Sequence, residues 1–235
     1  MDIIGWRYAI GEMVRAHMST PECTRYFSLK TTKPRAQLLL TELSLFTRHR
    51  RDCWAYVSGN CPVLPIKQKI LEHEYGEVIR DKHSDYGHLN LIIRQGAAIG
   101  LTAEAILNAQ PIPTTRATLY AWGWMCKQKS WIESLPALTV TEWTNDDRLL
   151  ADLGGGQSTR LAKRWMEDLG LQWKDLPNFR AHQEADEEHS DMFLPFLAAF
   201  AAGDREKSAL QGVQESLDLL TIYRGGVADA MEQLG

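Results

Sequence analysis

Apolar residues recur at steps of three and four along almost the whole chain. Because an α-helix turns by about 100° per residue, this spacing places apolar side chains on one helix face. Runs with a period of two and many β-branched residues, which would predict strands, are missing. The pattern therefore predicts an all-α protein, and clusters of glycine and proline mark where its helices end.

Eight segments between these breaks are predicted to be helices. They cover residues 34–57, 66–81, 88–100, 114–129, 130–143, 157–168, 178–202 and 204–234. The chain has 235 residues, of which 44% are hydrophobic, and this is enough for one sizeable core. Nothing in the composition requires a second core. We therefore expect a single domain over residues 1–235, built as a bundle of about seven to eight helices.

Charge and cysteine content narrow the class of protein. The formal net charge is −4, and the basic run 48–51 is short enough to be a solvated helix face. Nucleic acid and anionic membranes are therefore not expected as main partners. No segment approaches the roughly 20 apolar residues that cross a bilayer, and no signal-peptide pattern opens the chain. With four scattered cysteines that fit reduced thiols, these features predict a cytoplasmic protein.

The strongest chemical signal is a polar stripe in the predicted helix 178–202. His182, Asp186 and His189 follow one another at offsets of four and three, so two imidazoles and one carboxylate share a helix face. The same face continues into Phe193, Phe196 and Phe200. Buried ionisable groups need partners, and a metal ion is one way to supply them. An ion-pair cluster within the helix or a single zinc site would explain the spacing as well.

Three acids recur on the predicted helix 66–81. Glu74, Glu77 and Asp81 share a face with apolar residues, which is atypical of a solvated helix. Ion pairs with the lysines and the arginine of the same segment would explain these acids equally well. These acids indicate a metal site only together with ligands from elsewhere in the chain.

Pairs of an acid and a histidine add to this pattern. Asp85-x-x-His88 and Asp186-x-x-His189 resemble the Glu-x-x-His pair that ferritin-like bundles place around two irons. Glu142 lies in an apolar context between these pairs. A mixed shell of imidazoles and carboxylates suits iron or manganese, so the combined pattern indicates a metal site.

Together these motifs resemble the haem-oxygenase-like diiron oxidases and oxygenases. The resemblance covers about residues 35–200, and the late His-x3-Asp-x2-His motif is its most specific part. It implies a haem-oxygenase-like fold, two irons as cofactor and dioxygen as co-substrate. The ligands that it implies are His88, Glu142, His182, Asp186 and His189, with a further carboxylate from Glu77 or Asp81. Glu74 and Asp85 remain open for that carboxylate, and Glu42 is a candidate extra ligand.

The resemblance also implies an enzyme that oxidises a small metabolite. It favours an amino acid or amino-acid derivative, oxidised by N-oxygenation, desaturation or oxidative C–C cleavage in natural product biosynthesis. An external electron donor and a second copy of the chain are candidate partners. Arg94 or Arg116 could bind a substrate carboxylate, with surface ion pairs as the alternative. Tyr120, Trp124 and Trp131 could line an aromatic pocket, although core packing explains their spacing better.

Two other functions stay open at this point. A metal-independent enzyme resembling thiaminase II or the pyrroloquinoline-quinone synthase would use the same helical scaffold. A thiaminase would need a cysteine nucleophile, for which only Cys126 is well placed, and it would leave the His, Asp, His stripe unexplained. A non-catalytic metal-binding or helical interaction protein would retain a metal without oxygen-dependent turnover.

Overall fold

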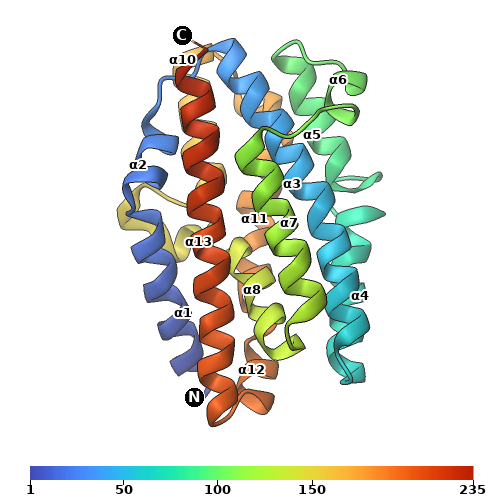
Figure 1. Cartoon of the computed structure of the whole chain (residues 1–235). Helices are drawn as coiled ribbons and strands as arrows, with labels where there is room; N and C mark the ends of the chain where they lie inside the picture. Colours follow the sequence, from blue (N-terminus) through green and yellow to red (C-terminus); the bar gives the residue numbers. More distant parts are fainter. Residues whose placement is uncertain (235) are drawn as a thin grey trace.

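The computed structural model shows a bundle of long helices that run roughly side by side (Figure 1). It describes residues 1–234, apart from the side chains of residues 185–188. The longer helices are α1 (Ile3–Met18), α3 (Lys33–Asn60), α4 (Leu64–Val78), α5 (Gly87–Ala98), α7 (Pro113–Gln128), α8 (Trp131–Trp143), α10 (Gln157–Leu169), α11 (Pro177–Asp191) and α13 (Asp204–Glu232). The shorter ones are α2 (Pro21–Ser28), α6 (Ala103–Leu107), α9 (Asp147–Leu150) and α12 (Leu194–Phe200), with 3-10 helices at Ala151–Leu153 and Trp173–Asp175. Within the described part of the chain there is no strand.

The all-α prediction is confirmed. The helices outnumber the predicted seven to eight, partly because two of them occupy residues 3–28. Both begin with ordinary capping signals, since the Asp2 and Thr20 side chains accept hydrogen bonds from the N–H groups of the third residues of α1 and α2. Pro21 then takes the first position of α2, where no N–H is needed. The spacing of apolar residues did not predict these two helices, although their capping residues are visible in the sequence.

Proline and loop geometry move two predicted helix ends. Pro195 divides the predicted helix 178–202, because it has no N–H to continue α11 but fits the first turn of α12. The predicted helix 66–81 ends early, at Val78, so Asp81 lies in the loop before α5. There its carboxylate accepts hydrogen bonds from two backbone N–H groups of the loop.

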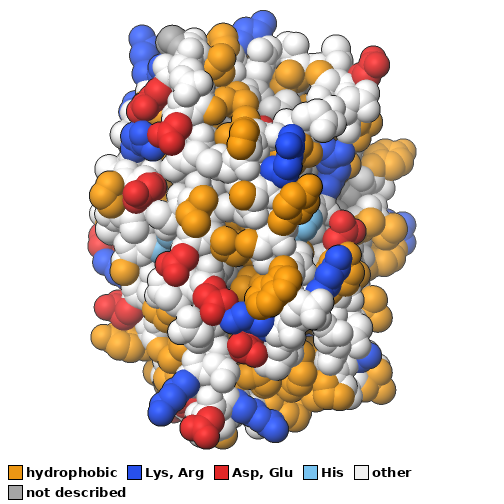
Figure 2. Space-filling view, viewed as in Figure 1, with side chains coloured by type: hydrophobic (Ala, Val, Ile, Leu, Met, Phe, Trp, Pro, Cys, Tyr) orange, Lys and Arg blue, Asp and Glu red, His pale blue; other side chains and the backbone are white. Residues whose placement is uncertain are grey.

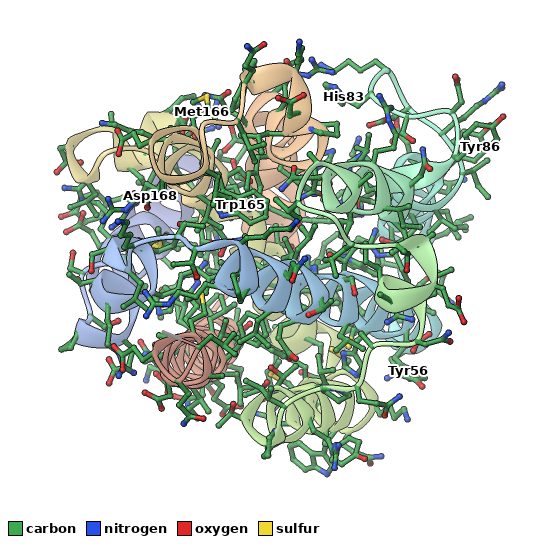
Figure 3. All side chains as sticks on the ribbon, turned by 90° about the horizontal axis from the view of Figure 1, so that it is seen from above. Tyr56, His83, Tyr86, Trp165, Met166 and Asp168 are labelled. Carbon is green, nitrogen blue, oxygen red and sulfur yellow. The ribbon has the colours of Figure 1, made fainter. Side chains whose placement is uncertain are left out.

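Helix α8 is enclosed by its neighbours. Every residue from 134 to 143 is buried, and a helix that is covered on all sides is typical of a bundle centre. It contacts α13, α11 and α3. Seen from above, Trp165 of α10 also points into the interior, whereas Tyr86 lies at the outer edge of the α4–α5 loop (Figure 3). Because Glu142 lies near the end of this enclosed helix, its carboxylate lies in the protein interior.

The outer surface mixes side chains of different kinds. On the face over α13, α3 and α7, acidic and basic side chains are interspersed with hydrophobic ones (Figure 2). The two termini lie at opposite ends of the bundle (Figure 1), and the N-terminal ammonium group forms an ion pair with Glu206 at 2.6 Å. Among the described helices, none has the length and apolar character that a membrane span requires.

The backbones of α8 and α13 approach each other closely at Gly212. A Cβ at this position would lie 2.2 Å from the backbone carbonyl oxygen of Glu133. Only glycine leaves room for such an approach. The contact fixes α13 against α8 and so positions Tyr223 and Arg224 further along α13.

We predict that Gly212→Ala lowers the free energy of unfolding by about 1–3 kcal/mol, because the atom that the new Cβ meets belongs to backbone. Gly59→Ala on α3 is the matched control, since a Cβ there meets nothing within 4 Å. Helix propensity predicts that this control is neutral or more stable by up to about 1 kcal/mol. Chemical denaturation measures both variants, and equal effects would contradict the close approach.

Candidate metal centre

Several of the predicted polar residues line a cavity between α3, α4, α8, α10, α11 and α13. The cavity contains about 640 Å³ of space that no protein atom fills, counting its solvent-open mouth. Glu77 of α4, Glu142 of α8 and His182 of α11 all line it. Residues far apart in the sequence therefore meet at one place, as a metal site assembled from several helices requires.

One group of possible ligands consists of His73, Glu77 and His189. One ligand atom from each residue lies within 4.8 Å of the other two. His73 and Glu77 share a face of α4 because they are four residues apart, and the His73 and His189 ring centroids are 4.8 Å apart. Both ring nitrogens of His73 are buried without a hydrogen bond, although Nδ1 lies 3.2 Å from a Glu74 carboxylate oxygen. Two imidazoles and one carboxylate form the donor set of many non-haem iron sites, so this group fits iron.

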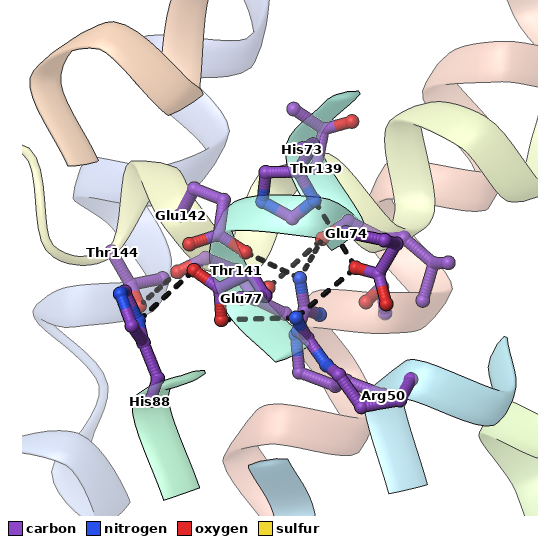
Figure 4. A network of polar contacts seen from close by, with 12 residues as sticks. Arg50, His73, Glu74, Glu77, His88, Thr139, Thr141, Glu142 and Thr144 are labelled. Carbon is purple, nitrogen blue, oxygen red and sulfur yellow. Dashed lines mark hydrogen bonds and ion pairs between the residues drawn. The ribbon is translucent and has the colours of Figure 1, made fainter. Parts of the chain in front are cut away.

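A second group surrounds His88 at the start of α5. Its Nδ1 lies 3.1 Å from Oε1 of Glu77, and its Nε2 lies 2.9 Å from Oδ2 of Asp81. The rings of His88 and His182 meet edge to face, with centroids 5.0 Å apart. Figure 4 shows the contact between Glu77 and His88 that joins this group to the first. Glu77 is thus the carboxylate common to both groups.

The protonation states of His73 and Glu77 suit metal binding. Burial lowers the pKa of His73 to about 3, so the ring is neutral at neutral pH. Burial opposes the ionisation of Glu77, but Arg51 and His88 outweigh it and hold the pKa of this carboxyl well below its usual value. Burial raises the pKa of Glu74 to about 7. A neutral imidazole and an ionised carboxylate are the forms that bind metals, so His73 and Glu77 need no proton change.

Two arginines of α3, the buried Arg50 and the half-buried Arg51, hold the carboxylates of this centre. Arg50, labelled in Figure 4, donates from Nη2 to Oε1 of Glu142 at 2.5 Å. Arg51 Nη1 lies 2.9 Å from a Glu77 oxygen and 3.0 Å from a Glu74 oxygen. The prediction of a solvated helix face for residues 48–51 is therefore wrong for these two. Charge alone gives no sign of it, because the same residues on the opposite helix face would lie in water.

The remaining ligand candidates lie apart from this centre or outside the described residues. Asp85 is exposed in the α4–α5 loop. Glu42 is buried but does not line the cavity, and it accepts a hydrogen bond from the Ile112 N–H at 3.3 Å. The side chain of Asp186 lies outside the described residues, so its role as a ligand stays a prediction. His73 was not predicted, although its spacing to Glu77 repeats the offset between His182 and Asp186.

The residues expected to bind substrate are mostly at the surface. Arg94 and Arg116 are exposed, and so are Tyr120 and Trp124, with 72% and 60% of their surface accessible. The core packing that the spacing favoured is therefore wrong for Tyr120 and Trp124, and neither of them lines the cavity. Trp131 packs against the core, as its spacing predicted.

Comparison with known families identifies the chain. A family model described as an iron-containing redox enzyme matches residues 37–221, which is most of its length. The chain belongs to this haem-oxygenase-like family. Membership in a family of iron-containing redox enzymes implies iron binding and agrees with the donor set around Glu77. No functionally curated protein matches the chain.

Two solved structures resemble this member of the iron-containing redox enzyme family. One is a domain of unknown function with a heme oxygenase-like fold from Shewanella denitrificans, with a TM-score of 0.75, 18% identity, and coverage of 100% of this chain and 95% of that chain. The other is a CADD-like protein of unknown function from Nostoc punctiforme, with a TM-score of 0.74, 13% identity, and coverage of 97% and 98%. At these identities the likeness establishes the fold alone. The predicted haem-oxygenase-like fold is confirmed.

We predict that His73→Ala weakens iron binding by more than about tenfold, because it removes one of the two imidazoles in the group with Glu77. Anaerobic titration with ferrous iron, followed by desalting and a colorimetric iron assay, measures the effect. His49→Ala on α3 is the matched control, since His49 does not line the cavity. Equal iron retention by wild type and His73→Ala would contradict the ligand role.

Proposed function

We propose that this chain is a non-haem diiron oxidase or oxygenase that activates dioxygen to oxidise a small metabolite. The observation that carries the proposal is the position of Glu77, which contacts His88 and belongs to the group with His73 and His189. A carboxylate between two sets of imidazoles suits a pair of metal ions better than one ion. Membership in a family of iron-containing redox enzymes selects iron.

In this proposal each metal position draws on residues of different helices. His73 and His189 would hold the first iron, and His88, His182 and Asp186 the second. Glu77 and Glu142 would complete the pair, and Asp81 would either bind iron or orient His88 through their hydrogen bond at 2.9 Å. Bound iron would supply the electron transfer to dioxygen that side chains do not provide.

The protein itself would position and shield this chemistry. Arg50 and Arg51 orient Glu142 and Glu77 and neutralise part of their charge. On the side of His73, Trp54 packs with its ring centroid 5.3 Å from the imidazole and stacks on Phe193 at 5.4 Å. This aromatic wall keeps water away from one side of the centre.

For the substrate we propose an amino acid or amino-acid derivative, oxidised by N-oxygenation, desaturation or C–C cleavage. The lining of the cavity combines apolar side chains such as Leu43 and Phe46 with arginines and amides. Such a lining suits a metabolite with both charged and apolar parts. If the reaction consumes more electrons than the substrate supplies, turnover would also require an external electron donor.

One observation favours a second candidate, a metal-independent enzyme on the same scaffold. The ion pairs of Arg50 with Glu142 and of Arg51 with Glu77 already compensate two carboxylates without a metal. The cysteine that a thiaminase reaction would need is poorly placed, because Cys126 is fully buried against Cys53 and does not line the cavity. The diiron proposal therefore explains more of the site.

Loading with iron distinguishes these candidates. We expect the protein, mixed anaerobically with ferrous iron and desalted, to retain about two irons per chain and to consume oxygen with a change in visible absorption when air is admitted. His189→Ala should lose at least one of these irons, because it removes an imidazole of the first group. Retention of zinc with no oxygen uptake after iron loading would reject the proposal.

A further inference from the structure

Arg224 of α13 is a buried cation without an acidic partner. Its surface is 1% exposed, and among the described residues no carboxylate oxygen lies within 4.0 Å of its guanidinium nitrogens. Its Nη2 donates to Oγ1 of Thr144 at 3.0 Å and to Oε1 of Gln157 at 2.8 Å. Its Nη1 lies 2.6 Å from Nε2 of His17, and its Nε has no hydrogen bond. All of these partners are neutral acceptors.

The surroundings of Arg224 do not supply the missing charge. Burial and then Arg224 itself lower the pKa of His17 to about 2, so this ring is neutral. The thiol of Cys23 lies 3.6 Å from Nη1, and the Phe27 ring centroid lies 5.3 Å from the guanidinium carbon. A second cation, Arg160, packs on the same ring at 4.1 Å, which adds to the positive charge of this region.

The other two arginines of the cavity are different. Arg50 and Arg51 also line it, and both form ion pairs with carboxylates of the chain. A buried charge is costly unless an opposite charge or strong hydrogen bonds compensate it. Within the described part of the chain, Arg224 is thus the cavity arginine that has no negatively charged partner. A bound anion would provide the missing negative charge.

A ligand in the cavity can reach both Arg224 and the candidate metal centre. Arg224, Thr144 and Gln157 line the same cavity as Glu77 and Glu142. Thr144 follows Glu142 by two residues at the end of α8, and both residues line the cavity. The buried hydroxyl of Tyr223, also without a hydrogen-bond partner, lines this part of the cavity and offers a further donor.

We propose that Arg224 binds the carboxylate of the substrate and so orients the rest of the molecule toward the acids and imidazoles around Glu77. A carboxylate that accepts from Nε and takes the place of Gln157 at Nη2 would form the bidentate pair that a guanidinium prefers. The orienting role rests on the proposed oxidation at a metal centre, whereas the binding of a carboxylate by Arg224 does not need a metal.

Acetate serves as the probe, and acetamide as its neutral counterpart. The full chain, treated with a chelator and kept at constant ionic strength with NaCl, should show a higher melting temperature with acetate than with acetamide. Arg224→Gln should raise the dissociation constant for acetate by more than about tenfold. Arg116→Gln, which removes an exposed arginine, should leave it unchanged.

A second variant tests the charge without removing the arginine. Gln157→Glu keeps the side-chain shape and places a carboxylate next to Nη2 of Arg224, so the chain then carries its own counter-charge. We expect this variant to melt at a higher temperature without ligand and to lose acetate binding. A purely structural Arg224 would not produce this pair of opposite effects. This arm also stands if Arg224→Gln does not fold.

The outcomes separate the two proposals. Equal stabilisation by acetate and acetamide, or acetate binding by Gln157→Glu at wild-type strength, would overturn the assignment of Arg224. Acetate binding that depends on Arg224 in a chain that binds no iron would instead keep this inference and reject the diiron function. The experiment therefore does not depend on activity.

Discussion

The compensation of buried charge between α3, α4 and α8 is the constraint on which the rest of this structure depends. Glu77 and Glu142 are carried into the interior by helices that pack closely, and a buried carboxylate persists as an anion only with partners at hydrogen-bond distance. Arg50 and Arg51 supply these partners from adjacent positions of α3. The two arginines therefore hold the acids in place whether or not a metal is bound.

Close helix packing is what makes this arrangement specific. The contact at Gly212 brings α13 against α8, and α8 in turn holds Glu142 beside the cavity. Because closely packed helices have little freedom to slide, the distances between acids and imidazoles are set by backbone positions. The likeness to solved haem-oxygenase-like structures at identities below 20% indicates that such packing survives wide sequence change. The chemistry of a site then depends on which few side chains face the cavity.

The sequence predicted the helical class, the family and several residues that line or border the cavity, because apolar periodicity and ligand spacing are local patterns. It did not predict His73, whose spacing to Glu77 is visible but is shared by many surface pairs. It misjudged Arg50 and Arg51, since a basic run on a helix is usually solvated. Burial of a charge depends on which helix covers it, and that is a property of tertiary packing.

The same reasoning explains why the sequence does not point to Arg224. Arg94 and Arg116 stand near helix starts and ligand motifs, whereas Arg224 lies more than 30 residues beyond the last motif. What distinguishes Arg224 is an absence: within the described residues no acid is near it, although acids accompany both other arginines of the cavity. An absent partner leaves no pattern in a sequence. It becomes visible only when burial and distance are known together, and from it we infer where a ligand would carry the opposite charge.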